Sequence, residues 1–315
     1  MPSDFLRTLK PFRAIASIVL TVTATSTALA EEHIIILSGL GGEAGFQQAF
    51  DEQAQQIQES ALSLGLSESQ VILLQNDDAS KENILSAITS LNTDSDDLIQ
   101  LHIIGHGSFD GSQYKFNIPG PDVTDSELAN ALNTQPAKQM VAVMTSASGA
   151  AMESLQADNR LVITATRTGL QKNVSVFSRY WAEGSNRSNV DLNKNEIVSI
   201  AELYNYTLER VTDYYESENL IASEASLIEG QDNIDADLFS LARIGQLANA
   251  SVSDEVEALL AERTEVEVKL SELSDRRQDL TEDEYFGELQ NLMLELGLLQ
   301  QRIDRELEQG GGVNE

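Results

Sequence analysis

Five apolar runs of strand length, separated by amphipathic helical segments, constrain the fold more than any other feature of this sequence. The runs are HIIILSG at 33–39, VILLQND at 71–77, LIQLHIIG at 98–105, MVAVM at 140–144 and LVITAT at 161–166. Strands that are apolar throughout, rather than at alternate positions, are buried on both faces. The pattern therefore predicts an α/β fold in which helices cover both faces of a mostly parallel sheet.

Residues 1–30 have the composition of an export signal. Basic residues precede a short apolar core, AIASIVLTVTATS at 14–26, and ALA at 28–30 is a cleavage site made of small residues. The apolar core is shorter than the ~20 residues that span a bilayer. We therefore expect a cleaved signal peptide, a periplasmic or secreted protein, and no membrane as a partner.

The charge balance and the absence of cysteine narrow the possible functions. The chain carries 51 acidic and 20 basic residues, a formal net charge of −31 at pH 7. Nucleic acids and anionic membranes bind through positive charge, so the composition argues against both. An acidic surface suits divalent cations or basic partners, or simply keeps a protein soluble. Because the chain has no cysteine, any nucleophile must carry oxygen or nitrogen.

Residues 251–309 change to heptad-like repeats, and we expect residues 310–315 to form a flexible tail. The repeats consist of Val256, Leu259, Val266, Leu270, Leu273 and Leu280, and of Tyr285, Leu289, Leu292, Leu296, Leu299 and Ile303, with Arg263 and Arg277 interrupting the first. The segment TEDE at 281–284 is a capping box that starts a second helix. We predict an antiparallel helical hairpin or coiled coil. It serves either local packing, or homo-oligomerisation or docking of a protein partner.

Two of the predicted strands end in residues suited to acyl chemistry. One leads into His106 and Gly107, and the other leads through Thr145 into Ser146. Sites on parallel sheets lie beyond the carboxyl ends of the strands, so we expect these residues to lie close together. Histidine can act as a general base and serine as a nucleophile. The small residues around Ser146 could equally serve close packing of a strand end under a loop.

These strand ends resemble those of the legumain (asparaginyl endopeptidase) family within the caspase-like clan of cysteine peptidases. GHGSFDG at 105–111 resembles the histidine block of that family, and TSASGA at 145–150 resembles its nucleophile block with serine in place of cysteine. LVITATRTG at 161–169 resembles the strand that follows. The likeness extends over residues 31–230. It implies a caspase-like three-layer sandwich over residues 31–250, with the helical hairpin outside it.

The resemblance also implies roles for individual residues. His106 would be the base, Ser146 would occupy the nucleophile position, and the backbone amides of Gly107 and Ser146 would be oxyanion donors. A thiol with a pKa near ~8.5 ionises readily beside a histidine, whereas a serine hydroxyl needs a well-oriented base during attack. Asp110 is the carboxylate nearest in sequence for that orienting role.

Three functions remain open at this point. The first is an exported peptidase homologue, non-catalytic or weakly active, that recognises a peptide or protein segment in a groove beside His106 and Ser146. The second is an active serine-dependent peptidase or transpeptidase that uses the same two residues. The third is an assembly protein that acts through the helical hairpin. His33 and His102 lie within predicted strands and are expected to be structural.

The segment DLNKNEIVSIAE at 191–202 has the ligand spacing of an EF-hand-like calcium loop. The ligands would be Asp191, Asn193, Asn195, the backbone carbonyl of Ile197, Ser199 and Glu202. Glu196 stands at the sixth position, where glycine normally takes the sharp turn. No clear entering helix precedes the loop, so it resembles a dockerin-like half motif. The alternative is a polar loop that caps the following helix.

We expect no organic cofactor, and Ca²⁺ is the one ion that the sequence suggests. GLGGEA at 39–44 superficially matches a dinucleotide-binding fingerprint. However, the acidic residues after the second strand, Asp77 and Asp78, come too late for a compact ribose-binding unit. A tight turn between strand and helix explains the glycines.

Overall fold

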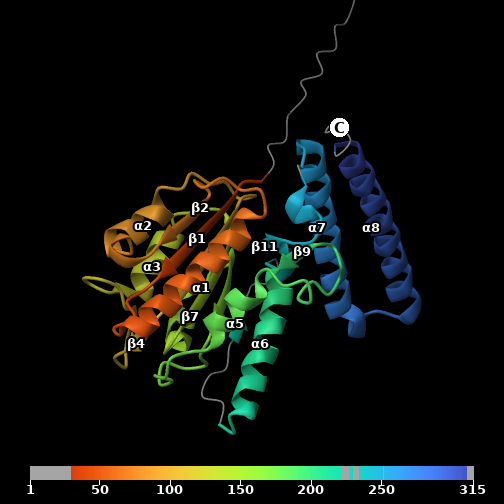
Figure 1. Cartoon of the computed structure of the whole chain (residues 1–315). Coiled ribbons are helices and arrows are strands. Elements are labelled where there is room, and N and C mark those ends of the chain that lie inside the picture. Colours follow the sequence, from red (N-terminus) through yellow and green to blue (C-terminus); the bar gives the residue numbers. More distant parts are fainter. Residues whose placement is uncertain (1–29, 221–226, 230–233, 251, 311–315) are drawn as a thin grey trace, which may run out of the picture.

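The computed structural model describes residues 30–220, 227–229, 234–250 and 252–310 (Figure 1). The predicted signal peptide, apart from its last residue, and the predicted tail from residue 311 onward lie outside the described residues. Within the described residues, no helix combines the length and the apolar character needed to cross a membrane.

A six-stranded sheet forms the centre of the fold, with its strands in the order β10-β8-β7-β3-β1-β2. Five of these strands are parallel, namely β1 (Glu32–Ser38), β2 (Val71–Leu74), β3 (Leu98–Gly105), β7 (Lys138–Thr145) and β8 (Arg160–Thr164). At one edge, β10 (Leu227–Glu229) pairs antiparallel with β8. The five apolar runs of the sequence are the five parallel strands.

Helices cover both faces of this sheet. One face carries α1 (Ala44–Leu62), α5 (Phe177–Gly184) and α6 (Ile200–Ser217), and the other carries α2 (Lys81–Thr89), α3 (Asp125–Leu132) and α4 (Met152–Leu155). Alternate residues of each strand face the two cores, so Ile34 belongs to the first core and Ile35 to the second. The expected three-layer α/β sandwich with a mostly parallel sheet is confirmed.

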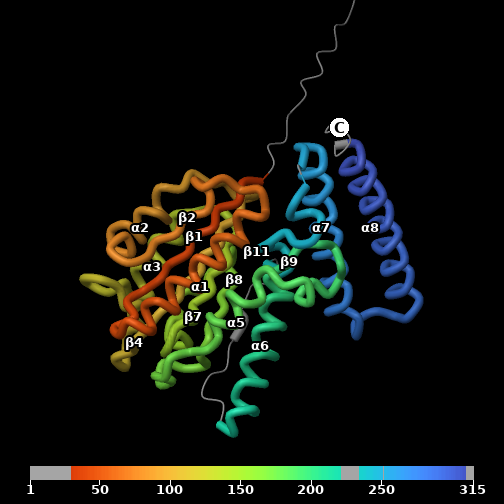
Figure 2. Tube along the Cα trace, viewed as in Figure 1, coloured from red at the N-terminus to blue at the C-terminus, as the bar shows by residue number. Residues whose placement is uncertain are grey.

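Two small antiparallel sheets flank the central one. β4 (Gly107–Phe109), β5 (Tyr114–Phe116) and β6 (Val123–Thr124) continue directly from β3. β9 (Ile197–Ser199) pairs with β11 (Ser240–Arg243), and Figure 2 places this pair between α1 and α7. Short 3₁₀ turns complete the chain at η1 (Asn76–Asp78), η2 (Ser148–Ala151), η3 (Ala236–Leu238), η4 (Leu247–Asn249) and η5 (Arg276–Asp279).

The predicted helical hairpin is also present. It consists of α7 (Asp254–Asp275) and α8 (Glu282–Gly310), with η5 between them, and α8 lies on the outer side of α7 (Figure 1). The capping box is confirmed, because Glu284 N donates to Thr281 Oγ1 (3.3 Å) and Thr281 N donates to Glu284 Oε2 (3.0 Å). Leu280 lies beyond α7 rather than in its repeat, because the chain tightens into a 3₁₀ turn first.

Arg263 explains one interruption of the first heptad repeat. The side chain is buried, and its Nη2 donates to the backbone oxygen of Asn195 (3.0 Å). Its Nη1 donates to Gln300 Oε1 on α8 (2.9 Å). One charged residue at a core position therefore joins α7 both to the loop before β9 and to α8.

Glu32, half-buried at the start of β1, provides a test of the electrostatics of this fold. Its Oε1 accepts a hydrogen bond from Gln100 Nε2 (2.7 Å). Burial raises the pKa of Glu32 from 4.5 to about 7, against the smaller opposing effects of the Gln100 hydrogen bond and the charge of Arg243. The folded protein thus favours the neutral acid. This preference stabilises the folded protein fully at pH values below the pKa that Glu32 has in the unfolded chain. The stabilisation is lost as the pH rises through about 7.

We therefore expect Glu32→Gln to be more stable than the parent protein at pH 8, because the glutamine stays neutral and can still accept from Gln100. This advantage should disappear below pH ~4.5. Thermal unfolding of both proteins across this pH range measures the difference. Glu68→Gln, at an exposed position, is the control and should show no such pH-dependent gain. A constant difference between Glu32→Gln and the parent at all pH values would contradict the prediction.

Candidate active site at the strand ends

The two segments singled out in the sequence lie side by side in the structure. β3 and β7 are neighbouring parallel strands, and Gly105 at the end of β3 is paired with Thr145 at the end of β7. His106 and Ser146 follow these two residues directly. The topology therefore brings the histidine block and the serine block to the same edge of the sheet.

The Ser146 hydroxyl is buried and engaged with the backbone of Gly107. Ser146 is only 3% exposed. Ser146 Oγ donates to Gly107 O (3.0 Å) and accepts from Gly107 N (3.2 Å). One hydroxyl group therefore bonds to both the backbone N–H and the backbone C=O of a single residue, Gly107. Here the Gly107 amide, expected as an oxyanion donor, points at the serine itself.

The His106 imidazole points in a different direction. Its Nε2 lies 3.1 Å from Gly41 O, in the loop after β1, and must carry the hydrogen in order to donate to that carbonyl. The ring also makes edge contacts with Phe46 and Phe50 of α1, at centroid distances of 5.4 and 5.2 Å. Among the described contacts, no hydrogen bond joins His106 to Ser146.

Gly107 allows the two strand ends to come this close. A Cβ at this position would lie 2.4 Å from Ser146 O, 2.6 Å from Thr145 Oγ1 and 2.6 Å from Tyr114 Cε2. Real Cβ contacts are not this short, so only glycine fits here. The close approach is what places the backbone of residue 107 against the Ser146 hydroxyl.

The residues after Ser146 are fixed by hydrogen bonds to the segment that follows β8. Ser148 Oγ accepts from Thr166 N (3.0 Å), and Gly149 N donates to Thr166 Oγ1 (3.0 Å). Ala147 takes a left-handed conformation (φ 57°), which is uncommon for a residue other than glycine. The hydroxyls of this block therefore hold the strand end against a neighbouring loop, which is the packing role considered for its small residues.

Asp110 does not orient His106. It lies in the turn between β4 and β5, where its carboxylate accepts from Lys115 Nζ (2.9 Å) and Ser112 N (3.0 Å). The Lys115 interaction and the turn amides hold the pKa of Asp110 well below its usual range. The carboxylate stabilises the hairpin turn, as aspartate commonly does.

One residue of this region was not expected from the sequence. Tyr114 on β5 is fully buried, and its hydroxyl lies 2.7 Å from Thr145 Oγ1 at the end of β7. Burial raises the pKa of Tyr114. Tyr114 thus supports the last residue before Ser146. The alternation in YKF, with two aromatic residues around a lysine, is the signal that could have indicated a buried face.

Apolar side chains are exposed next to His106. Leu40, which precedes the Gly41 that bonds to His106, is 44% exposed, and Phe46 is 38% exposed. We refer to Leu40, Phe46 and His106 as the strand-end patch. It lies at the carboxyl edge of the sheet, where loops after parallel strands commonly hold ligands.

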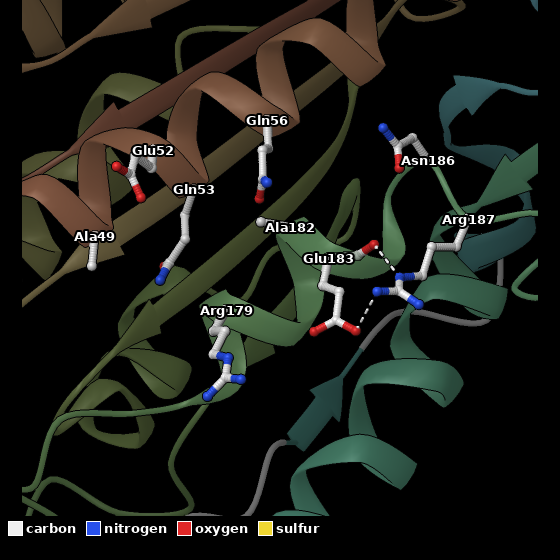
Figure 3. Close-up of a pocket in the computed structure, with 9 residues that line it drawn as sticks. All are labelled: Ala49, Glu52, Gln53, Gln56, Arg179, Ala182, Glu183, Asn186 and Arg187. Carbon is white, nitrogen blue, oxygen red and sulfur yellow. Dashed lines mark hydrogen bonds and ion pairs between the residues drawn. The ribbon is translucent and has the colours of Figure 1, made fainter.

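The two cavities described for the fold lie away from this patch. A cavity of about 430 Å³ lies between α1 and α5, lined by polar side chains such as Gln53, Gln56 and Arg179 (Figure 3). Within it, Figure 3 shows Arg187 pointing at Glu183, to which it is bonded at 2.8 Å. A second cavity of about 300 Å³ is lined in part by Ser60 of α1 and Arg243 of β11. Neither of the two is lined by His106 or Ser146.

The loop at 191–202 is a tight polar turn in which Lys194 and Glu196 both take left-handed conformations. Asp191 is buried, and its two carboxylate oxygens accept from Asn195 N (3.1 Å) and Glu196 N (3.2 Å). Glu196, at the glycine position of the motif, has a left-handed φ of 62°. The turn is therefore made without glycine, and the backbone oxygen of Glu196 is fixed by Ile244 N (2.9 Å).

Glu202 serves as a capping residue of α6 in this structure. Its Oε2 accepts from Ser199 N (3.2 Å) and its Oε1 accepts from Leu192 N (2.7 Å). Ser199 Oγ accepts in return from Glu202 N (3.2 Å), which completes a capping box. Burial raises the pKa of Glu202, against the opposing effect of the hydrogen bonds from the Ser199, Leu192 and Asn193 amides. The Leu192 hydrogen bond brings the Glu202 carboxylate to the residue that follows Asp191.

Groups from outside the loop also reach it. Asn195 Nδ2 donates to both carboxylate oxygens of Glu267 on α7 (3.0 Å each), and burial raises the pKa of Glu267. Within the loop, Lys194 Nζ donates to the backbone oxygen of Asp191. Over the described part of the chain, no group of three or more histidine, cysteine, aspartate or glutamate side chains is arranged to hold a metal ion. A cation in this loop would depend on amide, hydroxyl and carbonyl oxygens in addition to two carboxylates.

Comparisons with known proteins give structural neighbours but no family. No protein-family model matches the sequence, and no curated protein matches it. A solved protein from Geobacter sulfurreducens matches with a TM-score of 0.43 and 11% identity, covering 68% of this chain and 97% of its own. The Drosophila initiator caspase Dronc matches with a TM-score of 0.40 and 8% identity, and the match covers 77% of this chain and 96% of Dronc. The structure of pro-sf-caspase-1 matches with a TM-score of 0.40 and 12% identity, and the match covers 64% of this chain and 92% of that one. Two of these three are caspases.

Proposed function

We propose that this protein is an exported peptidase homologue that recognises a peptide or protein segment at the strand-end patch without hydrolysing it. The single observation that carries the proposal is the engagement of both candidate catalytic groups. The Ser146 hydroxyl is bonded to Gly107, and the His106 Nε2 is bonded to Gly41.

Hydrolysis would require several of these contacts to break. The serine oxygen must reach a carbonyl carbon and lose its proton to a base during the attack. In this arrangement the hydroxyl is buried and bonded to Gly107, and His106 makes its hydrogen bond to Gly41 rather than to Ser146. Asp110, the carboxylate considered for the orienting role, is instead bonded to Lys115. The exposed apolar side chains of Leu40 and Phe46 beside His106 instead offer a surface for a bound segment.

Turnover and binding can be separated with three variants. We expect Ser146→Ala and His106→Ala to show the same low turnover of a mixed peptide library as the parent protein. We expect Ser146→Ala to bind peptides of the library, displayed on an array, as strongly as the parent protein does. The Ser146 hydroxyl is bonded to the backbone of Gly107 and does not face the bound segment. Phe46→Glu should reduce that binding tenfold or more, since it places a charge in the apolar patch.

Leu208→Glu, at a leucine of α6 that is exposed to the same extent as Phe46, is the matched control and should bind like the parent. Turnover that disappears in both Ser146→Ala and His106→Ala would reject the non-catalytic proposal in favour of the serine peptidase. Equal binding by Phe46→Glu and the control would reject the strand-end patch.

We further propose that the loop at 191–202 binds Ca²⁺. The supporting observations are the burial of two acids, Asp191 and Glu202, at the first and last positions of the motif, the hydrogen bond from Leu192 N to Glu202, and the left-handed turn at Glu196. Asp191, Asn193, Asn195, the carbonyl of Ile197, Ser199 and Glu202 would supply the oxygen ligands. Glu202 caps α6 in this structure, so it would give up some of its capping hydrogen bonds in order to coordinate the ion.

Calcium should raise the midpoint of thermal unfolding. At a concentration one hundred times its dissociation constant, an ion that binds only the folded state adds about 2.7 kcal/mol, which corresponds to roughly 5 °C or more for a protein of this size. Asp191→Ala should abolish the shift, while Asp213→Ala, on the exposed surface of α6, should leave it intact. The absence of any shift at millimolar calcium in the parent protein would show that the loop is only a helix cap.

A further inference from the structure

The cavity between α1 and α5 is the larger of the two described above, and its lining is polar. Its volume of about 430 Å³ lies within the range of about 300–1,000 Å³ that small-molecule sites usually have. Of its 9 lining residues, two are alanines, and the others all carry a charged or an amide side chain (Figure 3). None of these lining residues is aromatic. Hydrogen bonds and charge would therefore hold a ligand in this cavity.

The lining carries one uncompensated charge of each sign, on two different helices. Arg187 and Glu183 neutralise each other through an ion pair of 2.8 Å. Arg179, on α5, has neither an ion-pair nor a hydrogen-bond partner among the described residues. Glu52, on α1, accepts a hydrogen bond from the neutral Gln48 (2.8 Å) but pairs with no cation in the described part of the chain. One positive and one negative group are thus left for a ligand.

Three side-chain amides add hydrogen-bonding groups to the lining. They belong to Gln53, Gln56 and Asn186, and none of them is bonded to another of the described residues. Figure 3 shows Gln53 and Gln56 pointing from α1 toward α5. Because an amide carries both donors and an acceptor, it matches a ligand group that also donates and accepts, such as a second amide or a hydroxyl.

We propose that this cavity binds a free amino acid whose side chain ends in an amide or a hydroxyl group. The guanidinium of Arg179 donates to the carboxylate of the ligand, and the carboxylate of Glu52 accepts from its ammonium group. The amides of the lining bond to the side chain of the ligand. A simple anion would be repelled by Glu52 and a simple cation by Arg179, whereas a zwitterion meets an opposite charge at both groups. The site shares no residue with the strand-end patch.

Titration of the ¹⁵N-labelled full chain with L-glutamine, followed by NMR chemical shifts, tests the site. We expect a dissociation constant of about 1 mM, because the polar lining buries little apolar surface. Two analogues each lack one charged group of glutamine: glutaramic acid has no amine, and 4-aminobutanamide has no carboxylate. Each should bind at least tenfold more weakly than glutamine, and so should L-leucine, which has no polar side chain. No binding of glutamine at about 50 mM, or equal binding of any of these three compounds, would overturn the proposal.

Two variants test which protein group meets which ligand group. Arg179→Gln should weaken glutamine binding tenfold or more, and it should then bind glutamine and 4-aminobutanamide equally, because the carboxylate has lost its partner. Glu52→Gln should in the same way bind glutamine and glutaramic acid equally. Both side chains are exposed, so both variants are expected to fold. A variant that still prefers glutamine tenfold over the corresponding analogue would overturn the proposal.

Each variant has a control of the same chemistry. Arg210 lies over the Tyr180 ring at 5.3 Å, as Arg179 does at 5.2 Å, but it does not line the cavity. Glu59 is an exposed acid of α1 that also lies outside the lining. Arg210→Gln and Glu59→Gln should therefore bind glutamine like the parent protein. Equal losses in Arg179→Gln and Arg210→Gln would show a general effect of charge and overturn the proposed contact with the carboxylate.

Discussion

Replacing Gly107 with alanine will lower the free energy of unfolding by about 3 kcal/mol. The added methyl group would lie 2.4 Å from the backbone oxygen of Ser146 and 2.6 Å from a ring carbon of the buried Tyr114. Neither group is the end of a flexible side chain, so the ends of β3 and β7 must separate. Urea-induced unfolding followed by far-UV circular dichroism measures the loss.

A second glycine near the same site provides the control. Gly45 lies at the start of α1, beside Phe46, and an added Cβ there would meet no atom within 4 Å. Gly45→Ala should therefore leave stability unchanged or raise it slightly, because alanine is the better helix residue. A loss in Gly107→Ala no larger than the change in Gly45→Ala would mean that the strand ends can move apart without cost.

Trp181→Ala should cost still more, about 4 kcal/mol. The indole is fully buried on α5, stacked on Phe177 at a centroid distance of 5.6 Å and lying 6.1 Å from the His102 ring on β3. Its removal leaves a cavity between the helix layer and the sheet. The midpoint of thermal unfolding should fall by roughly 10 °C.

Because Trp181 is the one tryptophan of the chain, this variant must be followed by circular dichroism rather than by intrinsic tryptophan fluorescence. Leu220→Ala, at a position that is 56% exposed, is the control and should change the free energy of unfolding by less than about 0.5 kcal/mol. Comparable losses in the two variants would contradict the assignment of Trp181 to the core.

The sheet could be predicted from the sequence because its signal is local. Each parallel strand is a continuous apolar run such as HIIILSG, and burial on both faces follows directly from that composition. β9, β10 and β11 could not be predicted in the same way. They have three or four residues each, and their pairing depends on partners distant in the chain, as between Ser240 and Ser199.

The candidate site was predictable in its position but not in its hydrogen bonds. Parallel pairing of β3 with β7 brings His106 and Ser146 to one edge, which the order of the strands already implied. The direction of the imidazole depends on Phe46 and Phe50 of α1, and a sequence pattern does not contain such packing. The engagement of the Ser146 hydroxyl likewise follows from the close approach of Gly107.

The loop at 191–202 illustrates a different difficulty, because two motifs share the same residues. Ser199 and Glu202 occupy the ninth and twelfth positions of a calcium loop, and they also form the S-x-x-E pattern of a capping box. The spacing is identical for both, so the sequence left both readings open. In the structure the capping hydrogen bonds are formed.

The buried guanidinium of Arg263 has a consequence for how the two C-terminal helices are aligned. Apolar heptads can slide past each other by a turn with little change in contact, whereas a polar group in the seam must find its acceptors. Displacing α8 by one turn, about 5.4 Å, would take Gln300 away from Arg263 and leave a buried charge with fewer partners. This side chain therefore selects one register of the hairpin, and with it the set of residues that α8 presents outward.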